Sequence, residues 1–261
     1  MGLLLAYATD AGLHRENNED AVLVWNDRAG LDALLVVADG MGGHAAGQLA
    51  STLAVETFSR ELEGDGAGGC DPARLHNAFL KANAAVFKAS HDLPDAAGMG
   101  CTFTVAAIKD GQMGLLNVGD SPAYLYRGDR IEMISEDHSW PAEQARLGVI
   151  SPEEARDHPF KHRLTRAVGV WDEVLAYTAE VPLRDGDLVV LCSDGVESAG
   201  VALEEVQKFL SSEDLEQALG EIIATCRERG APDNVTVAVA RVGEGSGSSA
   251  ATETVRIGTR H

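Results

Sequence analysis

The sequence has few basic residues for its length, and this shortage limits the partners it can have. Its 261 residues include 21 Lys and Arg against 41 Asp and Glu, which gives a formal net charge of −20. A surface this acidic repels nucleic-acid backbones and anionic lipid. We therefore expect neither a nucleic-acid partner nor binding to a membrane.

Long apolar runs and paired cysteines are also missing. No run approaches the ~20 apolar residues that a transmembrane helix needs, and residues 1–8 lack the basic region and cleavage site of a secretory signal. The four cysteines lie far apart, without the CxxC or Cys/His spacing typical of zinc sites. We expect a cytoplasmic protein with reduced thiols.

What remains is an ordinary globular composition, with 45% hydrophobic and 24% charged residues. Hydrophobic patterns and turn residues predict the elements. Strands are expected at 3–8, 21–25, 33–38, 101–108, 112–118, 123–127, 130–134, 174–181, 187–192 and 235–242. Helices are expected at 47–62, 72–90, 202–210 and 214–229, with Leu49, Phe58, Phe79 and Val86 as core positions.

Four further segments have local patterns that predict a meander, an inserted flap, a loop and a mobile tail. The close spacing of the four strands between 101 and 134 predicts one antiparallel meander. Residues 138–172 interrupt the strands with two short helical pieces, the second opened by a capping box at Ser151, and resemble an inserted flap. Residues 64–69 are a Gly-rich loop, and the tail from 243 to 261 is expected to be mobile because it is poor in apolar residues.

The helices come in pairs and do not alternate regularly with the strands. This order favours an α+β fold over a doubly wound parallel sheet. Two antiparallel sheets with a helix pair outside each, a four-layer α-β-β-α sandwich over residues 1–242, account for every predicted element.

Acidic residues fall at the ends of the predicted strands. The positions are Glu19, Asp20, Asp39, Asp120, Asp194 and Asp233. For any one of them, a turn residue whose side chain bonds to local backbone is an adequate explanation. Asp39 and Asp194 differ because each closes an apolar run suited to a buried sheet, where an unpaired carboxylate is costly. An all-oxygen set suits Mg²⁺ or Mn²⁺ better than zinc.

Short motifs around these acids occur in an order that resembles bacterial members of the PPM (type 2C) family of metal-dependent Ser/Thr protein phosphatases. The motifs are RENNED at 15–20, VADGMGGH at 37–44, GMGCT at 98–102, NVGDS at 117–121, DHS at 137–139, LTRAVG at 164–169, CSDG at 192–195 and PDNVT at 232–236. Each is weak alone. Together they span about residues 5–242, and the resemblance implies the same two-sheet sandwich with metals in a cleft at one edge.

The resemblance also implies residue roles. Asp20, Asp39, Asp194 and Asp233 would be carboxylate ligands of two Mn²⁺ or Mg²⁺ ions, with the Gly40 carbonyl as a further ligand and Glu19 acting through a metal-bound water. Asp120 would serve a third, weaker cation shared with Asp194. Arg15 would bind the substrate phosphate, and His44 would protonate the leaving group.

The chemistry of phosphate monoester hydrolysis suits this set of residues. Two cations roughly 3.5–4 Å apart can activate a bridging water as hydroxide and neutralise phosphoryl oxygens. A planar guanidinium binds two oxygens at once, and an imidazole titrates near neutral pH. Simpler interpretations remain open: Arg15 in an ion pair with Glu16 or Glu19, His44 as an exposed loop residue, and the basic run at 161–163 of the flap either contacting phosphopeptides or lying in solvent.

The leading hypothesis is a Ser/Thr protein phosphatase that opposes Ser/Thr kinases, acts on phosphorylated proteins and works as a monomer. The alternatives are a pseudophosphatase that binds phosphoproteins without turnover, and a sandwich that binds cations only for structure. Ser193 as a nucleophile lacks a G-x-S-x-G elbow, and His138 is expected to be structural or peripheral. Hydrolysis of p-nitrophenyl phosphate with Mn²⁺ or with a chelator separates the three hypotheses.

Overall fold

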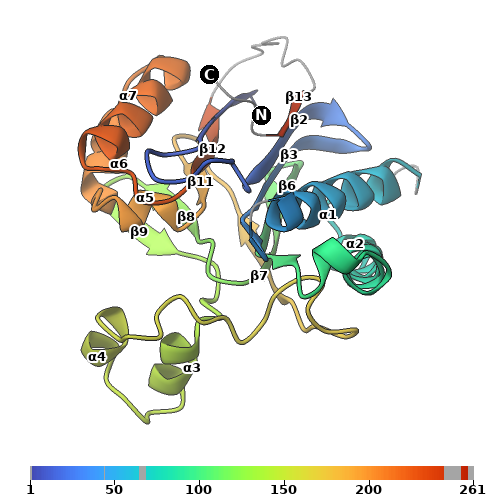
Figure 1. Ribbon diagram of the computed structural model, residues 1–261. Coiled ribbons are helices and arrows are strands. Elements are labelled where there is room, and N and C mark those ends of the chain that lie inside the picture. The colour runs from blue at the N-terminus through green and yellow to red at the C-terminus, as the bar shows by residue number, and fades with distance from the viewer. Residues whose placement is uncertain (1, 44, 65–68, 244–253, 258–261) are drawn as a thin grey trace.

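The computed structural model describes residues 2–43, 45–64, 69–243 and 254–257, and its architecture is a four-layer α-β-β-α sandwich. Two antiparallel sheets stack face to face, and a helix pair covers the outer face of each, as Figure 1 shows. The fold class expected from the sequence is confirmed.

The first sheet has five strands in the order β1-β12-β11-β8-β9, and the second has six in the order β10-β7-β6-β3-β2-β13. The strands of the first are β1 (Gly2–Asp10), β8 (Ala123–Arg127), β9 (Arg130–Met133), β11 (Leu188–Cys192) and β12 (Val235–Gly243). Those of the second are β2 (Ala21–Arg28), β3 (Leu31–Ala38), β6 (Phe103–Lys109), β7 (Gln112–Val118), β10 (Tyr177–Pro182) and β13 (Thr254–Ile257). A small separate ladder joins β4 (Gly40–Met41) and β5 (Gly100–Cys101).

Two long helices pack on the six-stranded sheet, and two others pack on the five-stranded sheet. They are α1 (Ala45–Gly64) and α2 (Pro72–Asp92) on the former, and α6 (Leu203–Leu210) and α7 (Leu215–Glu228) on the latter. The short helices are η1 (Pro94–Ala96), α3 (Trp140–Arg146), α4 (Pro152–Arg156) and α5 (Gly195–Ser198). Within the described parts of the chain, no helix is long and apolar enough to cross a membrane.

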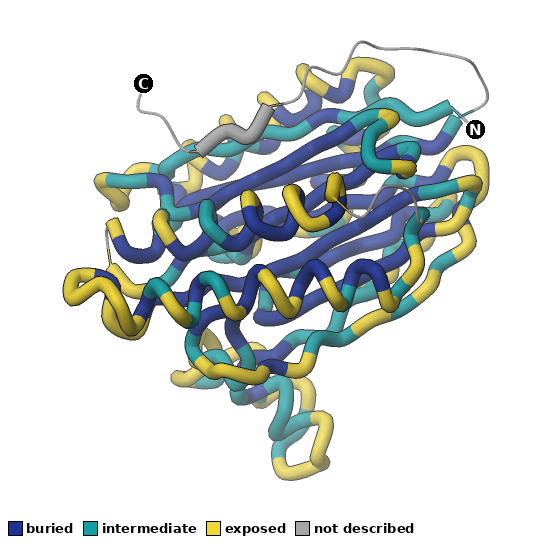
Figure 2. The backbone as a smooth tube through the Cα atoms, turned by 90° about the vertical axis from the view of Figure 1, so that its right-hand side faces the viewer, coloured by how far each residue is buried: buried dark blue, intermediate teal, exposed yellow. Residues whose placement is uncertain are grey.

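Three hydrophobic cores fill the spaces between the four layers. On β2, Leu23 and Trp25 belong to the core under α1 and α2, whereas Val22 and Val24 belong to the core between the sheets. The alternation follows from the two-residue repeat of a strand, so both faces of β2 are buried. A third core lies under α6 and α7, and Figure 2 shows buried positions concentrated along the strands and the inner sides of the helices.

Antiparallel pairing brings the acidic residues to one end of the sandwich. Asp20 precedes β2 and Asp39 follows β3, and these neighbouring strands pair with Ala21 opposite Ala38. In the other sheet, Asp194 follows β11 and Asp233 precedes β12, with Cys192 opposite Val237. The end of one strand and the start of its antiparallel neighbour lie at the same edge, so each sheet contributes one pair of carboxylates.

The prediction of one meander between residues 101 and 134 is wrong. β6 pairs with β7 in one sheet, and β8 pairs with β9 in the other. The chain crosses between the sheets at the turn 119–122, where Gly119 has φ +100° and a Cβ would lie 2.7 Å from Thr102. Close spacing in sequence indicates hairpins, but it does not distinguish one sheet from two stacked sheets.

Smaller differences concern the helices and the tail. Leu49 is 38% exposed, because the small residues of α1, including Ala46, Ala50 and Ala54, face the sheet instead. β10 begins at Tyr177, three residues later than expected. Most of the predicted Gly-rich loop at 64–69 and most of the tail at 243–261 lie outside the described residues. Thr254–Ile257 pairs with β2, for which the sequence contains no signal we recognised.

The flap between β9 and β10 contains α3 and α4 and projects below the sheets in Figure 1. Its second helix begins with the predicted capping box: Glu154 donates its backbone N–H to Ser151 Oγ, and the backbone N–H of Ser151 bonds to the Glu154 carboxylate. The end of the flap returns to the core through backbone hydrogen bonds between Cys101 and Val168. The flap is therefore anchored beside the end of the sandwich that carries the carboxylates.

Candidate active site

A cavity of about 370 Å³ opens at the acidic end of the sandwich. Its lining includes most of the predicted site residues: Arg15, Glu19, Asp39, Gly40, Asp120, Asp194 and Asp233. Asp20 lies beneath it, 1% exposed, and His44 lies outside the described residues. Segments from both sheets and from the flap thus meet around one space.

Thr102 fixes the position of Asp39. The Asp39 backbone N–H donates to Thr102 Oγ1 at 2.8 Å, and the Thr102 backbone N–H donates to the Asp39 carbonyl at 2.8 Å. Thr102 Oγ1 also lies 2.6 Å from Ser121 Oγ, beside Asp120. One buried hydroxyl therefore connects the segments that carry Asp39 and Asp120. In the sequence, Thr102 is only the last letter of the GMGCT motif, and nothing local indicates this role.

Asn234 holds the loop that carries Arg15 and Glu19. Its Nδ2 donates to the carbonyls of Ala11 at 2.9 Å and Asn17 at 3.0 Å, and its Oδ1 accepts the Glu19 backbone N–H at 2.8 Å. The amide is 4% exposed, and these three bonds use both of its ends. Asn234 is a positioning residue that could not be recognised from the sequence, because its partners lie more than 200 residues away.

Gly40 and Gly47 permit a close backbone approach beside Glu19. A Cβ on Gly40 would lie 2.2 Å from the Gly47 carbonyl oxygen, and one on Gly47 would lie 1.9 Å from Glu19 Oε2. The Gly40 backbone N–H also donates to the Glu19 carbonyl at 3.2 Å. A side chain at Gly40 would clash with the backbone of Gly47 and Glu19, so the motif around Asp39 requires glycine after it, and a side chain at Gly47 would displace the Glu19 carboxylate.

The Ser193 hydroxyl is used for structure. It donates to Asp20 Oδ2 at 2.8 Å and accepts the Thr236 backbone N–H at 3.0 Å, and the residue is 1% exposed. A hydroxyl that already donates one hydrogen bond, accepts another and has no access to solvent is unsuited to attack a substrate. The environment gives no support to the serine nucleophile considered from the sequence.

Each of these carboxylates makes ionisation of its neighbours less favourable. Burial raises the pKa of Asp20 to about 7, with the charges of Asp194 and Asp233 adding to the shift. Burial and the neighbouring aspartates, Asp20 first, hold the pKa of Asp39 well above its usual range. Burial also raises the pKa of Asp194, and Asp233 adds to it. Removing several carboxylates from water in one place is costly unless cations compensate them.

Two buried carboxylate oxygens lack hydrogen-bond partners in the described parts of the chain and are available to a cation. Asp20 Oδ1 and Asp194 Oδ1 are buried, and neither has a hydrogen-bond partner among the described residues. Such orphaned acceptors are rare in proteins and call for a partner. The proposed ligands beside them, the aspartates and the Gly40 carbonyl, offer oxygen donors, which match Mg²⁺ and Mn²⁺. The residues present therefore fit divalent cations.

The side chains do not form a closed ligand shell by themselves. Among the described residues, no three His, Cys, Asp or Glu side chains stand close enough together to hold a metal ion as a preformed cluster. The assignment of individual ligands therefore stays a prediction.

Arg15 lies at the mouth of the cavity with half of its side chain exposed. Its Nη2 donates to Asp233 Oδ2 at 2.7 Å, and this hydrogen bond raises the pKa of the guanidinium further. The simpler interpretation from the sequence is an ion pair with Glu16 or Glu19; the side-chain hydrogen bond in the structure is to Asp233, 218 residues away. The remaining guanidinium donors are available to an anion that enters the cavity.

His138 supports the turn that carries Asp120. Burial, with a contribution from Arg166, lowers the pKa of its imidazole to about 4, so the ring is neutral at pH 7 and its Nδ1 accepts the Gly119 backbone N–H at 3.1 Å. The His138 backbone N–H donates to the Gly119 carbonyl at 3.1 Å. This buried residue has the structural role expected from the sequence.

His162 is a flap residue that reaches the site, as Leu164 also does. It lines the cavity, and its Nδ1 lies 3.5 Å from Asp194 Oδ2. From the sequence it was only part of a basic run at 161–163. Its proximity to Asp194 depends on how the flap packs against the sheets, and no local pattern encodes that packing.

Comparisons with known proteins agree with the resemblance. The family model described as Protein phosphatase 2C matches residues 13–239. The serine/threonine protein phosphatase PstP of Mycobacterium tuberculosis is 38% identical over 242 residues, which are 92% of this chain and 45% of that protein. This chain thus spans about half the length of that relative. The serine/threonine phosphatase stp of Listeria innocua is 34% identical over 234 residues, 88% of this chain and 92% of that protein.

Solved structures are similar over nearly the same range. The crystal structure of the PstP catalytic domain in complex with two manganese ions aligns with a TM-score of 0.79 and 35% identity, and it covers 93% of this chain and 99% of that one. The serine/threonine phosphatase Stp1 from Staphylococcus aureus aligns with a TM-score of 0.80 and 29% identity, covering 93% and 96%.

Proposed function

This chain belongs to the protein phosphatase 2C family, and from that membership we propose that it hydrolyses phosphoserine and phosphothreonine in proteins with the help of two divalent cations. The observation that carries the proposal is the cavity at the end of the sandwich. Five aspartates surround or underlie it, two of their buried oxygens lack partners among the described residues, and a guanidinium stands at its mouth.

The residues divide into those that would hold cations and those that would bind substrate. Asp20, Asp39, Asp194 and Asp233, with the Gly40 carbonyl, are the ligands we propose, and Glu19 lies beside them. Bound there, the cations would supply an activated water and neutralise phosphoryl oxygens. Arg15 would orient the phosphate through two parallel hydrogen bonds, exchanging Asp233 for the substrate. We also propose that Mg²⁺ can replace Mn²⁺ and that Asp120 binds a third cation.

A pseudophosphatase is the second hypothesis. Loss of metal ligands is the usual route to such inactivity, yet every proposed carboxylate is present and all but Asp20 line the cavity directly. The physiological partners we propose are therefore phosphorylated proteins as substrates and Ser/Thr kinases as opposing enzymes.

The test is hydrolysis of p-nitrophenyl phosphate and of a phosphothreonine peptide with Mn²⁺, with Mg²⁺ and with excess EDTA. We expect turnover that EDTA abolishes and added Mn²⁺ restores. Tight binding of the phosphopeptide without turnover in either metal would favour the pseudophosphatase. Turnover that persists in EDTA would contradict the metal-dependent mechanism.

Arg15→Ala is expected to lower kcat/KM for a phosphothreonine peptide roughly 10- to 100-fold, the usual value of hydrogen bonds between charged groups. Arg15 binds phosphate in this proposal and contacts Asp233 only through one hydrogen bond. Calorimetric titration should therefore show Mn²⁺ affinity nearly unchanged.

Arg15→Lys is the matched control, because it keeps the positive charge and loses the planar pair of donors. We expect its activity to lie between those of the parent and Arg15→Ala. A large loss of Mn²⁺ affinity in Arg15→Ala would assign the residue to support of Asp233 and not to substrate.

A further inference from the structure

A second cavity, of about 330 Å³, lies between the flap and the five-stranded sheet. It shares Asp120, His162 and Asp194 with the first cavity, so the two spaces are continuous at those residues. Its volume is at the lower end of the range for ligand pockets, ~300–1,000 Å³. The proposed function, on which this inference rests, places the phosphate of a bound phosphopeptide in the first cavity. A residue next to the phosphorylated one is then within reach of the second cavity.

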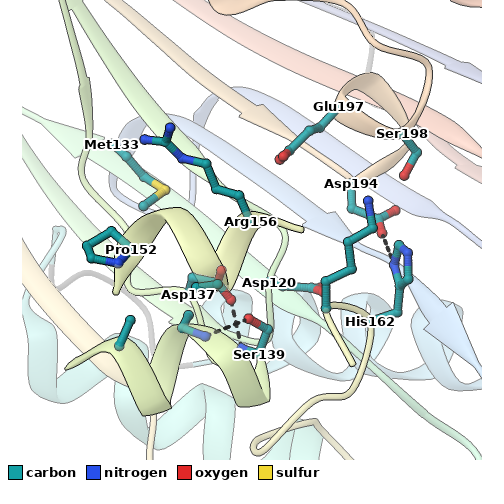
Figure 3. Close-up of a pocket in the computed structure, with 14 residues that line it drawn as sticks. Asp120, Met133, Asp137, Ser139, Pro152, Arg156, His162, Asp194, Glu197 and Ser198 are labelled. Carbon is teal, nitrogen blue, oxygen red and sulfur yellow. Dashed lines mark hydrogen bonds and ion pairs between the residues drawn. The ribbon is translucent and has the colours of Figure 1, made fainter. Parts of the chain in front are cut away.

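The walls of this flap pocket are built from short and unbranched side chains. Ala142 and Ala145 of α3 with Pro152 and Ala155 of α4 form the flap side, and Figure 3 shows Met133 of β9 near Pro152. Small residues leave room for a side chain to enter, and the flexible Met133 adapts to its shape. The walls thus suit the aliphatic stem of a long side chain.

Carboxylates face the interior of the pocket. Figure 3 shows Asp137 at the base, near Ser139, and Glu197 of α5 on the far side. One oxygen of Asp137 accepts the Ser139 backbone N–H at 2.7 Å, and burial raises the pKa of this carboxyl. Among the described residues, neither Asp137 nor Glu197 forms an ion pair, although Arg156 and Lys161 line the same pocket.

The positions of these charges determine which occupant fits. Arg156, Lys161 and Glu197 are exposed, whereas Asp137 is partly buried, so the deepest of these four charges is negative. Asp120 and Asp194 are assigned to cations in the first cavity, which leaves Asp137 and Glu197 as the carboxylates of this pocket that can receive a positive charge. A long side chain with a positive end would place its stem against the alanines and its charge near these carboxylates.

We propose that the flap pocket is a specificity site that binds a lysine or arginine side chain of the substrate, close in sequence to the phosphorylated residue. The net charge of −20 also favours the approach of such basic peptides. An acidic side chain held by Arg156 and Lys161 is the competing occupant, and peptides that carry glutamate distinguish it.

The test uses phosphothreonine peptides of otherwise uncharged sequence, with one lysine placed in turn at each position from three before to three after the phosphothreonine. Norleucine and glutamate replace the lysine in matched peptides. We expect one lysine position at which kcat/KM exceeds that of the norleucine peptide about tenfold, chiefly through KM, because the pocket does not contact the reacting atoms.

Asp137→Asn and Glu197→Gln remove the charges while keeping shape, and Asn retains an oxygen for the Ser139 N–H. In the double variant the lysine advantage should fall to about one, while the rates with p-nitrophenyl phosphate and with the norleucine peptide stay within about twofold of those of the parent. Glu56→Gln combined with Glu61→Gln, both exposed on α1, removes the same two charges and is the control for net charge alone; it should preserve the advantage.

Three outcomes would overturn the inference: no lysine position is favoured, a glutamate is favoured instead, or the lysine advantage survives in the double variant. Fluorescence anisotropy of labelled peptides measures the same preference without turnover. Failure of the proposed function would look different, since the parent would then not hydrolyse even the norleucine peptide with Mn²⁺.

Discussion

Asp39→Asn and Asp194→Asn are each expected to lower turnover of p-nitrophenyl phosphate about 10³-fold while the fold survives. Each aspartate closes a buried strand and lines the cavity, and the amide that replaces it is neutral and a weaker ligand for a hard cation. Loss of one electrostatic contact to a charge that develops in the transition state commonly lowers kcat 10²–10³-fold. Loss of a metal ligand would weaken both cation binding and the positioning of the phosphate. Turnover and calorimetric Mn²⁺ titration are the measurements.

The stability of the metal-free variant provides an independent check on Asp39. In the absence of cations, the folded protein must hold this carboxylate among Asp20, Asp194, Asp120 and Asp233, and that repulsion is absent from the unfolded chain. The Asp39→Asn substitution removes the repulsion, so the metal-free variant should melt higher than the metal-free parent, by about 2–4 °C for each kcal/mol relieved.

Mn²⁺ should raise the melting temperature of the parent and raise that of the Asp39→Asn variant much less, because a ligand stabilises only the state that binds it. If this variant hydrolysed substrate at the parent rate, Asp39 would be removed from the ligand set. A variant that is inactive and also melts lower without metal would indicate a structural role instead.

The layers of the fold could be predicted because the signals are local. The apolar run at 33–38 is too short for a buried helix, which identifies it as a strand. The helix pairs at 47–62, 72–90, 202–210 and 214–229 carry apolar residues at mostly helical spacing. The division of strands between sheets could not be predicted. β7 and β8 are separated by four residues, yet they belong to different sheets, and only packing against distant strands decides this.

For the candidate site too, some residues could be predicted from the sequence and others could not. The carboxylates could be found from the sequence because strand ends and Asp-Gly pairs are visible in it, and antiparallel pairing then brings them together. Asn234, Thr102 and His162 could not be assigned roles, because each acts through contacts with residues far away in the sequence. Arg15 differs: the resemblance implied a role in binding phosphate, but its hydrogen-bond partner Asp233 could not be predicted from the sequence.

Asp120→Ala is expected to leave two tightly bound Mn²⁺ ions and still lower turnover about 10²-fold. Asp120 lies between the two cavities, where burial raises its pKa to about 8 and Asp194 adds to the shift. A site with few protein oxygens binds a hard cation weakly. Activity of the parent should therefore keep rising with Mn²⁺ after the tight sites are filled, and the variant should lose this second rise.

The competing explanation is that Asp120 only stabilises its turn, and contacts made by other residues argue against it. Gly119 is held by His138, and Ser121 is held by Thr102 and by Thr104, whose hydroxyl donates to the Ser121 carbonyl at 2.7 Å. None of these bonds uses the Asp120 carboxylate, so its removal should leave the turn intact, and the melting temperature of the metal-free variant should not fall below that of the metal-free parent. Asp120→Asn keeps a hydrogen-bonding side chain and loses the charge. If this variant showed the parent rate and the second rise with Mn²⁺, Asp120 would be a turn residue; if it behaved like Asp120→Ala, the charge itself would be required.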